Sequence, residues 1–377
     1  MTEQQRYEQV DLPFYNAQVA PILPPAVLDF HAHAWKPDQR LDNSFGQGDA
    51  PAPQDRADVQ LERRKGATYM VTQTDYGAER LLSDGQRIFP GRRYNAVFFG
   101  NPTPAVDVAL ANSYVAESAR SSGLYPLIVV GRDRLAIGSL KEQIVECGFF
   151  GYKVFLDWLG DDYGEVAVED MIGPAEMQLA DQLGLIVLLH VPRARRLADP
   201  DVQSGVRAYA LRYPNARIVL AHCGRCYLPD EIKDAVPTVR DLENVYVDTS
   251  MVMDPMVLRV VFENIDSRRV LFGTDFPVAA MRGRRVRVMD HWVDVVLEGY
   301  PPSAFRVASN GIRATFMAYE IVLAIKAAGE MAGLHQQQIR DVFFENGMAV
   351  LAHVANGEQL KTVQRLRTGK RAVEHTP

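Results

Sequence analysis

Short apolar runs alternate with amphipathic segments along most of the sequence. The apolar runs have about the length of a strand, and they comprise residues 26–30, 69–72, 124–130, 149–156, 185–190, 217–222, 245–248 and 270–272. Each is largely apolar on both faces, as expected for strands of a parallel sheet that is covered on both sides. Segments with helical spacing follow several of them, at residues 171–183, 202–212, 255–264 and 339–352. This order of elements predicts an α/β protein.

Eight candidate strands without an obvious linker favour a closed (β/α)₈ barrel, or TIM barrel, over an open sheet. A doubly wound sheet stays an alternative, although no Gly-rich dinucleotide loop follows the first strand. We therefore expect one domain over residues 1–377, with the barrel at about residues 26–352. A short N-terminal extension, a long loop after strand 1 and C-terminal helices complete the expected architecture. The chain is 47% hydrophobic, which is enough apolar material for a core of this size.

Two segments interrupt the alternation. Residues 36–58 are rich in Pro, Gly, Asp and Gln, and a lid over the site and a disordered loop are equal alternatives there. Residues 276–316 contain four closely spaced arginines, Arg282, Arg284, Arg285 and Arg287. We favour a solvated charge run for this cluster over the attraction of an anionic substrate.

Charge and cysteine content restrict the function classes. The net charge of −6 argues against nucleic acid as a partner, because nucleic-acid binding needs a broad basic face. Three cysteines are too few and odd in number for a disulfide framework, which favours a reducing compartment. The polar N-terminus and the absence of a long apolar run predict a cytoplasmic protein with no membrane partner.

Chemically competent side chains stand at the ends of four predicted strands. His31 and His33 follow the first strand, His190 and His222 end two others, and Asp275 follows the last. Because the carboxyl ends of barrel strands open onto one face, we expect these residues to converge there. Side chains two apart on a strand point the same way, so both His31 and His33 can face the interior. Three histidines and one aspartate form a sensible catalytic set for a divalent metal.

The chain resembles the amidohydrolase superfamily, and within it the branch similar to aminocarboxymuconate-semialdehyde decarboxylase. The matching stretches run in the family's order, and they are Leu28-Asp-Phe-His-Ala-His, Gly151-Tyr-Lys-Val, Leu189-His, Tyr213-Pro-Asn-Ala-Arg-Ile-Val-Leu-Ala-His-Cys-Gly, Asn244-Val-Tyr-Val-Asp-Thr-Ser and Val270-Leu-Phe-Gly-Thr-Asp-Phe-Pro. The His-x-His pair alone is a weak signal, whereas the ordered set is a strong one.

This resemblance implies a (β/α)₈ barrel with one divalent metal ion, zinc or else manganese, held by His31, His33, His190 and Asp275. It also implies that His222 stands beside the metal as an acid, a base or a polarising group. Asp275 would in addition accept a proton from the water at the metal. Related proteins are often dimers or higher oligomers, so a homo-oligomer is an open alternative.

Lys153 introduces an alternative set of ligands. In other branches of the superfamily, a lysine at the end of the fourth strand is carboxylated and bridges two metals, and Lys153 stands at the matching place. We favour the mononuclear site, in which Lys153 binds an anion or is simply a strand-end lysine. The count of bound metals distinguishes the two.

Three further observations concern the surroundings of the site. Arg193 follows His190 on a loop, where it would clamp a substrate carboxylate or be an ordinary surface arginine. Trp158, beyond the fourth strand, is a weaker candidate for substrate binding. The Cys-x-x-Cys at Cys223 and Cys226 lacks a second pair and a redox fold, so we interpret it as incidental.

We therefore predict a metal-dependent hydrolase of a small carboxylated lactone, ester or amide. A non-oxidative decarboxylase or hydratase at the same site is the first alternative. A binuclear hydrolase with carboxylated Lys153 and a non-catalytic ligand-binding barrel are the others.

Overall fold

Parallel strands form the centre of the structure, a computed structural model that describes residues 1–41, 75–101, 106–155, 164–297, 305–307 and 313–354. The central strands are β1 (Ala26–His33), β2 (Arg93–Phe99), β3 (Tyr125–Pro126), β4 (Ile128–Val129), β5 (Gly151–Val154), β6 (Ile186–Leu189), β7 (Arg217–Leu220), β8 (Val245–Asp248) and β9 (Val270–Leu271). They pair in sequence order, as one sheet of β1 to β3 and one of β4 to β9. Only Leu127 separates β3 from β4, so these two short strands together fill one of the eight barrel positions.

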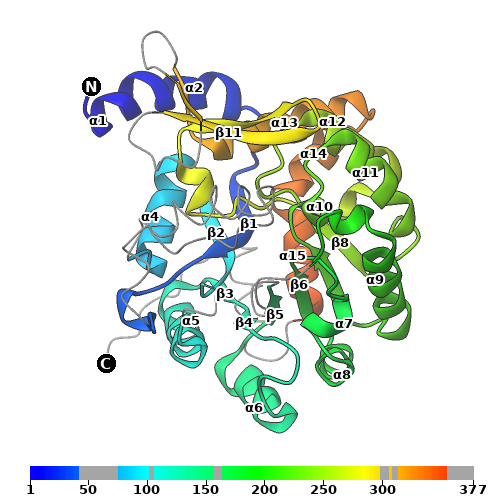
Figure 1. Cartoon of the computed structure of the whole chain (residues 1–377). Helices are drawn as coiled ribbons and strands as arrows, with labels where there is room; N and C mark the ends of the chain where they lie inside the picture. The colour runs from blue at the N-terminus through cyan, green and yellow to red at the C-terminus, as the bar shows by residue number, and fades with distance from the viewer. Residues whose placement is uncertain (42–74, 102–105, 156–163, 298–304, 308–312, 355–377) are drawn as a thin grey trace, which may run out of the picture.

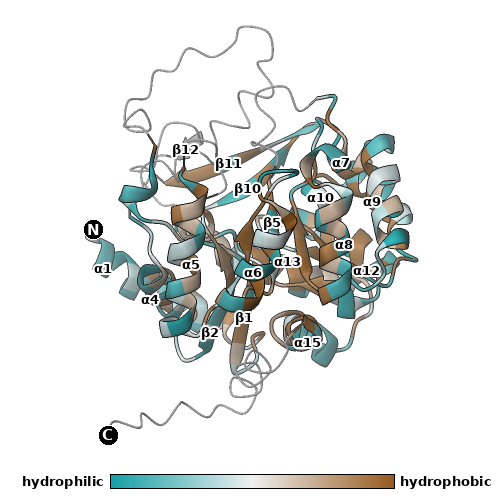
Figure 2. Cartoon of the chain, turned by 90° about the horizontal axis from the view of Figure 1, so that it is seen from below, coloured by the Kyte–Doolittle hydropathy of each residue, from teal (hydrophilic) through white to brown (hydrophobic). Residues whose placement is uncertain are grey.

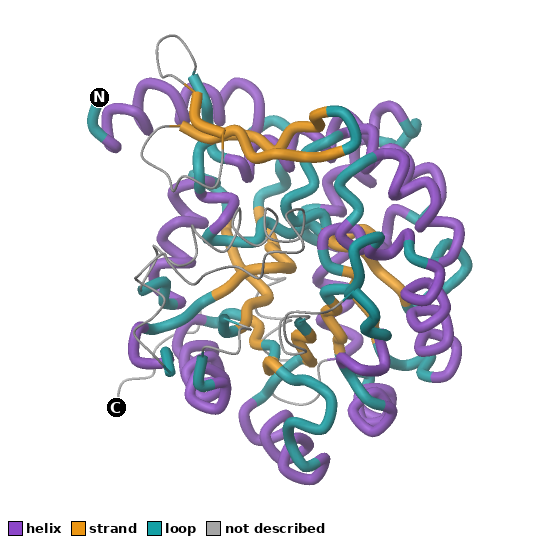
Figure 3. The backbone as a smooth tube through the Cα atoms, viewed as in Figure 1, coloured by secondary structure: helices purple, strands orange, loops and turns teal. Residues whose placement is uncertain are grey.

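Backbone hydrogen bonds connect the two sheets. The amide of Leu127 donates to the carbonyl of Phe98 on β2 at 2.9 Å, and the amide of Phe30 on β1 donates to the carbonyl of Phe272 at 2.7 Å. The first and last strands are thus neighbours. The fold is the predicted (β/α)₈ TIM barrel, and Figure 3 shows its central strands among the surrounding helices.

Helices cover the outside of the strands, and the barrel interior and the helix undersides carry the apolar residues (Figure 2). The covering helices are α4 (Ala78–Ile88), α5 (Val108–Ser122), α6 (Ile137–Cys147), α7 (Val168–Met171), α8 (Pro174–Leu183), α9 (Pro200–Arg212), α11 (Pro229–Ala235), α12 (Pro255–Asn264), α13 (Met317–Met331), α14 (Gln336–Val342) and α15 (Glu345–Val354). None of the described helices is long and apolar enough to cross a bilayer.

Local sequence sets where the helices begin. Helices α9 and α12 both start with an Asp-Pro pair, in which the carboxylate of Asp199 or Asp254 accepts a hydrogen bond from the amide two residues later. Proline then takes the first helical position, where its missing N–H leaves no bond unmade. The same sequence signal thus places two helices that follow barrel strands.

The sequence-based prediction is confirmed for most of the barrel strands, and it missed one. Seven of the eight predicted strands coincide with strands of the structure, and the eighth, residues 69–72, lies outside the described residues. The second barrel strand of the structure is β2, which was missed because Arg93 and Asn95 break the apolar run in its first half. Residues 42–58 of the proposed lid also lie outside the described residues.

An arm after β9 was not predicted. Strands β10 (Gly283–Val288) and β11 (His291–Leu297) form an antiparallel hairpin, and β12 (Phe305–Val307) pairs with β11. Figure 1 shows this arm beside the N-terminal helices α1 (Glu3–Arg6) and α2 (Leu12–Phe14).

The arginine cluster on this arm is not the solvated run that we favoured. Arg284 and Arg287 are half exposed, but Arg282 and Arg285 are buried in ion pairs. Arg282 binds Asp11 and Glu3 of the N-terminal segment, and Arg285 binds Asp294 on β11. Arg282 and Arg285 are buried where they meet these carboxylates, which compensate their charge. The charge pattern of the sequence does not show these partners.

Candidate metal centre

The His-x-His pair occupies the end of β1, and both rings are buried, with exposed fractions of 1% for His31 and 4% for His33. Asp275, just beyond β9, meets both. Its Oδ1 lies 3.1 Å from Nε2 of His33 and 3.5 Å from Nε2 of His31. Two imidazole nitrogens and one carboxylate oxygen thus converge from the first and last strands of the barrel.

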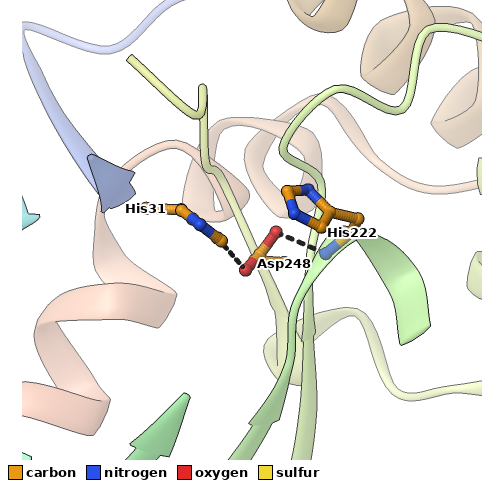
Figure 4. A group of neighbouring side chains, drawn as sticks. All are labelled: His31, His222 and Asp248. Carbon is orange, nitrogen blue, oxygen red and sulfur yellow. Dashed lines mark hydrogen bonds and ion pairs between the residues drawn. The ribbon is translucent and has the colours of Figure 1, made fainter. Parts of the chain in front are cut away.

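Asp248, the last residue of β8, fixes the orientation of His31 (Figure 4). Its Oδ2 lies 2.9 Å from Nδ1 of His31. A carboxylate only accepts hydrogen bonds, so Nδ1 carries the proton and the lone pair is on Nε2, the atom near Asp275. This carboxylate–histidine arrangement is the usual support for a metal-binding imidazole.

His222, the first residue of α10 (His222–Arg225), lies beside His31 with ring centroids 4.8 Å apart. Its Nδ1 is 3.0 Å from the carbonyl oxygen of Ser250, which accepts a hydrogen bond, so Nδ1 is the protonated nitrogen. Its backbone amide donates to Oδ1 of Asp248 at 2.9 Å. The lone pair of His222 is therefore on Nε2.

The backbone is strained where two of these residues sit. His222 has a φ of 54° and Asp275 a φ of 68°, both in the left-handed region that side chains rarely adopt. Such conformations persist only where the surroundings hold them, and they cluster at functional sites.

His190 lies just past β6, and its ring is perpendicular to that of His222 with centroids 5.2 Å apart. The His190 ring also contacts Phe155, at 4.6 Å between centroids. The Nδ1 atom is buried and has no hydrogen-bond partner among the described residues. A buried ring nitrogen without a partner in the protein is expected where the histidine binds an additional group such as a metal ion.

The protonation states suit a metal. Burial lowers the pKa of His33 to about 4 and that of His222 to about 3, and burial followed by the charge of Arg225 lowers that of His190 well below its ordinary value. Burial alone would raise the pKa of Asp248, but His31 and His222 outweigh it and bring it to about 2. The pKa of Asp275 is likewise lowered, since His33, His222 and His31 together outweigh its burial. Neutral imidazoles and ionised carboxylates are the forms that bind metals.

Within the described part of the chain, two groups of side chains bring their ligand atoms within 4.8 Å of one another. One comprises His31, His33 and Asp275, and the other His31, His222 and Asp248. His190, predicted as a ligand, belongs to neither group. Nitrogen and carboxylate donors of this kind fit zinc or manganese.

Lys153 on β5 is completely buried next to the same histidine. Its Nζ lies 3.3 Å from Nε2 of His31 and 4.7 Å from the centroid of Phe99. Burial lowers its pKa to about 8, although Asp248 and Asp275 oppose the shift. Both alternatives from the sequence, an anion-binding lysine and a carboxylated ligand, remain compatible with this place.

Arg193, for which the sequence left two alternatives, is engaged by neighbouring loops. Its Nε donates to the carbonyl of Val166 at 3.0 Å, and its Nη1 binds Asp199 and Asp201. Its Nη2 lies 3.4 Å from the carbonyl of Glu165. All three guanidinium nitrogens therefore contact the surrounding loops.

Two further expectations concerned Trp158 and the cysteine pair Cys223 and Cys226. Trp158 lies outside the described residues. Cys223 and Cys226 are both free thiols buried in the core. Burial raises the pKa of each thiol above its ordinary value, to about 12 for Cys226, which disfavours the thiolate that metal binding or redox chemistry requires.

Sequence reasoning missed two carboxylates, Asp29 and Asp248. Asp29 lies beneath the site, where its Oδ1 accepts hydrogen bonds from the amides of His31 and Thr274 and its Oδ2 accepts one from the hydroxyl of Tyr94. It thereby ties β1 to the segment that carries Asp275. Both carboxylates fall inside motifs quoted above, and a charged residue within an apolar strand was the available signal.

A TIM barrel with this set of donors at its strand ends has the architecture of a metal-dependent enzyme. The family model described as Amidohydrolase matches residues 28–288, and the chain belongs to this family of hydrolases and lyases. The resemblance found in the sequence is thus confirmed. A search of the curated proteins gives no match to this chain.

Solved structures of the same fold are distant in sequence. The 4-oxalomesaconate hydratase of Rhodopseudomonas palustris is 13% identical, with 92% of this chain and 100% of that chain covered and a TM-score of 0.55. A dihydroxybenzoic acid decarboxylase of Polaromonas sp. JS666 with bound manganese is 14% identical, with 89% and 99% covered and a TM-score of 0.50. A zinc-bound amidohydrolase of Burkholderia multivorans is 14% identical, with 86% and 98% covered and a TM-score of 0.50.

Proposed function

We propose that the chain acts as a single-domain, metal-dependent hydrolase of a small carboxylated lactone, ester or amide. The observation that carries the proposal is the convergence of Nε2 of His31, Nε2 of His33 and Oδ1 of Asp275. These three residues, with His190 as the fourth ligand, would hold one divalent ion, zinc or manganese. Such an ion polarises a substrate carbonyl and lowers the pKa of water toward about 7.

The proton transfers fall to His222. Its Nδ1 is bound to the carbonyl of Ser250, which leaves Nε2 as the basic nitrogen beside His31. Burial lowers its pKa to about 3, so the ring is neutral at neutral pH and its Nε2 lone pair is available. In the proposed reaction it takes the proton of the attacking water and returns it to the leaving group. Ser250 and the backbone contact with Asp248 hold the ring in place.

The charge balance of the site favours an anionic substrate. Asp248 and Asp275 are ionised, and Lys153, with a pKa of about 8, is mostly protonated at neutral pH. A divalent ion would add two positive charges, so the buried centre would carry net positive charge. A carboxylated substrate compensates it.

A lyase reaction at the same residues is the second candidate. Two of the structures that share this fold are named as a 4-oxalomesaconate hydratase and a dihydroxybenzoic acid decarboxylase. Both names give an organic acid as the substrate. Proton transfer by His222 serves either reaction, since hydration and decarboxylation also move one proton at the reacting carbon. The two are separated by product analysis: release of CO₂ or addition of water to a double bond indicates a lyase.

The first experiment is metal analysis by plasma mass spectrometry on protein purified without chelator or affinity nickel. We expect about one equivalent of zinc or manganese per chain, lost in the variant His31→Ala/His33→Ala. The matched control is His291→Ala/His335→Ala, which removes two exposed histidines and should keep the metal. About two equivalents would instead indicate a binuclear site with carboxylated Lys153. No metal after reconstitution would overturn the proposal.

The second experiment addresses His222. On metal-loaded protein, and with a lactone or ester substrate found by screening, His222→Asn should lower kcat by about 100-fold or more with the metal content unchanged. Unchanged turnover in this variant would exclude the proposed role of His222.

A further inference from the structure

Arg285, which comes from the arm and not from a barrel strand, contacts an aromatic ring that also neighbours His222. The centre of its guanidinium is 4.6 Å from the ring centroid of Tyr227, and the centroid of Tyr227 is 6.1 Å from that of His222. Only one aromatic ring therefore separates this cation from the proposed base.

Three contacts fix the orientation of the guanidinium. Its Nε donates to Oδ1 of Asp294 at 2.8 Å and its Nη2 donates to Oδ2 at 3.0 Å. Its plane lies over Trp292, at 3.8 Å from the ring centroid, and Trp292 in turn contacts Tyr227 at 5.0 Å. An arginine that is stacked and paired in this way loses little further entropy when it binds a ligand.

One nitrogen of Arg285 is left over. The ion pair with Asp294 uses Nε and Nη2, and no residue in the described ranges hydrogen-bonds to Nη1. Of the neighbouring arginines, Arg193 is tied to its own loops and Arg196 pairs with Glu231 at 2.8 Å. Within the described ranges, Arg285 thus keeps a donor that a ligand can use.

The electrostatics agree with this geometry. Burial lowers the pKa of Arg285, but Asp294, Tyr227 and Asp275 outweigh it and raise the pKa above its ordinary value. Asp275, a proposed metal ligand, has the smallest effect of the three. Once Asp275 is neutralised by a metal, that attraction becomes available to an anionic substrate.

We infer that Arg285 is a specificity-determining residue whose Nη1 binds the carboxylate of the substrate, with Asp294, Trp292 and Tyr227 as its support. The substrate class is a small organic acid in which this carboxylate stands apart from the group that reacts at the metal. The inference rests on the proposed function, because it needs a metal centre to hold the reacting end of the substrate. It also accounts for the arm, which brings the Arg285–Asp294 pair to the barrel.

The test compares carboxylates with their neutral amides as ligands of the metal-loaded protein. The probes are benzoate and benzamide, 2-hydroxybenzoate and 2-hydroxybenzamide, and glutarate and glutaramide, each titrated by calorimetry. For wild type we expect at least one carboxylate to bind more tightly than its amide. In Arg285→Met the Kd of that carboxylate should rise about 10- to 100-fold, the range of one charge-assisted hydrogen bond, and that of the amide should not change.

Two further variants keep the test decisive. Arg285→Met leaves Asp294 buried without its partner, so the double variant Arg285→Met/Asp294→Leu removes both charges together and must show the same loss. Arg284→Met, on the exposed side of the same strand, is the matched control and should bind like wild type. Unchanged carboxylate affinity in the double variant, or no preference for any carboxylate in wild type, would overturn the inference. Metal content, measured on every sample, separates this outcome from failure of the proposed function itself.

Discussion

Oδ2 of Asp248 lies 2.9 Å from Nδ1 of His31, and Oδ1 of the same carboxylate accepts hydrogen bonds from the amides of His222 and Ser250. One carboxylate at the end of β8 therefore sets the tautomer of a proposed metal ligand and the position of the proposed base (Figure 4). Because these neighbours engage both oxygens, we expect Asp248 to act through them as a positioning residue.

The first prediction concerns this residue. Asp248→Asn removes the charge that stabilises His31 as a ligand, and we expect the metal affinity to fall by about 10- to 100-fold, as for other supporting carboxylates. Competition with a chromophoric chelator measures it. The control is Asp241→Asn, which breaks the exposed ion pair with Arg207 and should leave the affinity as it is. Equal affinities in both variants would contradict the positioning role.

The sequence predicts the fold and the centre of the site because both depend on local patterns. Apolar runs that end in His or Asp mark barrel strands, and the strand ends of a barrel share one face, so His31, His33, His222 and Asp275 could be brought together in advance. The roles of Arg193 and Arg285 could not, because they depend on which carboxylates lie nearby in space. Asp294 is nine residues from Arg285, on the next strand of the hairpin. No strong periodicity in the sequence predicts this hairpin.

The second prediction concerns acid stability. Burial holds the pKa of His33 at about 4 in the folded protein, against an ordinary value of 6.5. Between these values the unfolded chain binds a proton that the folded chain does not, so stability falls as the pH drops from about 6.5 to about 4. The slope is up to about 1.4 kcal/mol per pH unit for this histidine, while Asp29, whose pKa burial raises to about 7, contributes with the opposite sign.

The measurement is urea unfolding of metal-depleted protein across this pH range. His33→Gln should make the pH dependence shallower than in wild type over this window, because it removes one group that titrates only in the unfolded state. His291→Gln, at an exposed position, should keep the wild-type slope. A slope that is the same in all three proteins would show that His33 is not held neutral by burial.

The third prediction concerns the contact between the N-terminal segment and the arm. Nη2 of Arg282 lies 2.6 Å from Oδ2 of Asp11, both side chains are buried, and the guanidinium also lies over Phe316 at 4.4 Å. Asp11→Asn removes the buried one of the two carboxylates that bind Arg282 and leaves Glu3, which is exposed, so it should lower the free energy of unfolding by about 2 kcal/mol. Urea denaturation measures this change.

Arg284→Ala provides the comparison for this contact. It removes the next arginine along the same segment, which is half exposed and lies 3.4 Å from Glu320, and it should lower stability by less than about 1 kcal/mol. Since Arg285 follows on β10, Asp11→Asn should also weaken carboxylate binding if the N-terminal segment holds the arm in place. A loss of stability below about 1 kcal/mol in Asp11→Asn would mean that the pair contributes no more than a surface contact.

The last prediction concerns Gly273, which lies between β9 and Asp275. A Cβ atom built on this glycine would be 3.1 Å from Cβ of His31 and 3.2 Å from Cβ of Ser250, and neither is the end of a flexible side chain. In Gly273→Ala the backbone near His31 must therefore move by a few tenths of an ångström, and metal coordination tolerates only about 0.2 Å. We expect weaker metal binding in a folded protein, measured by chelator competition together with the melting temperature. Gly138→Ala in α6, where the added methyl group meets open space, should instead keep the affinity and raise stability by up to about 1 kcal/mol. If Gly273→Ala binds metal like wild type, His31 has room to adjust, and the close packing of β1 against the end of β9 is not what positions the ligands.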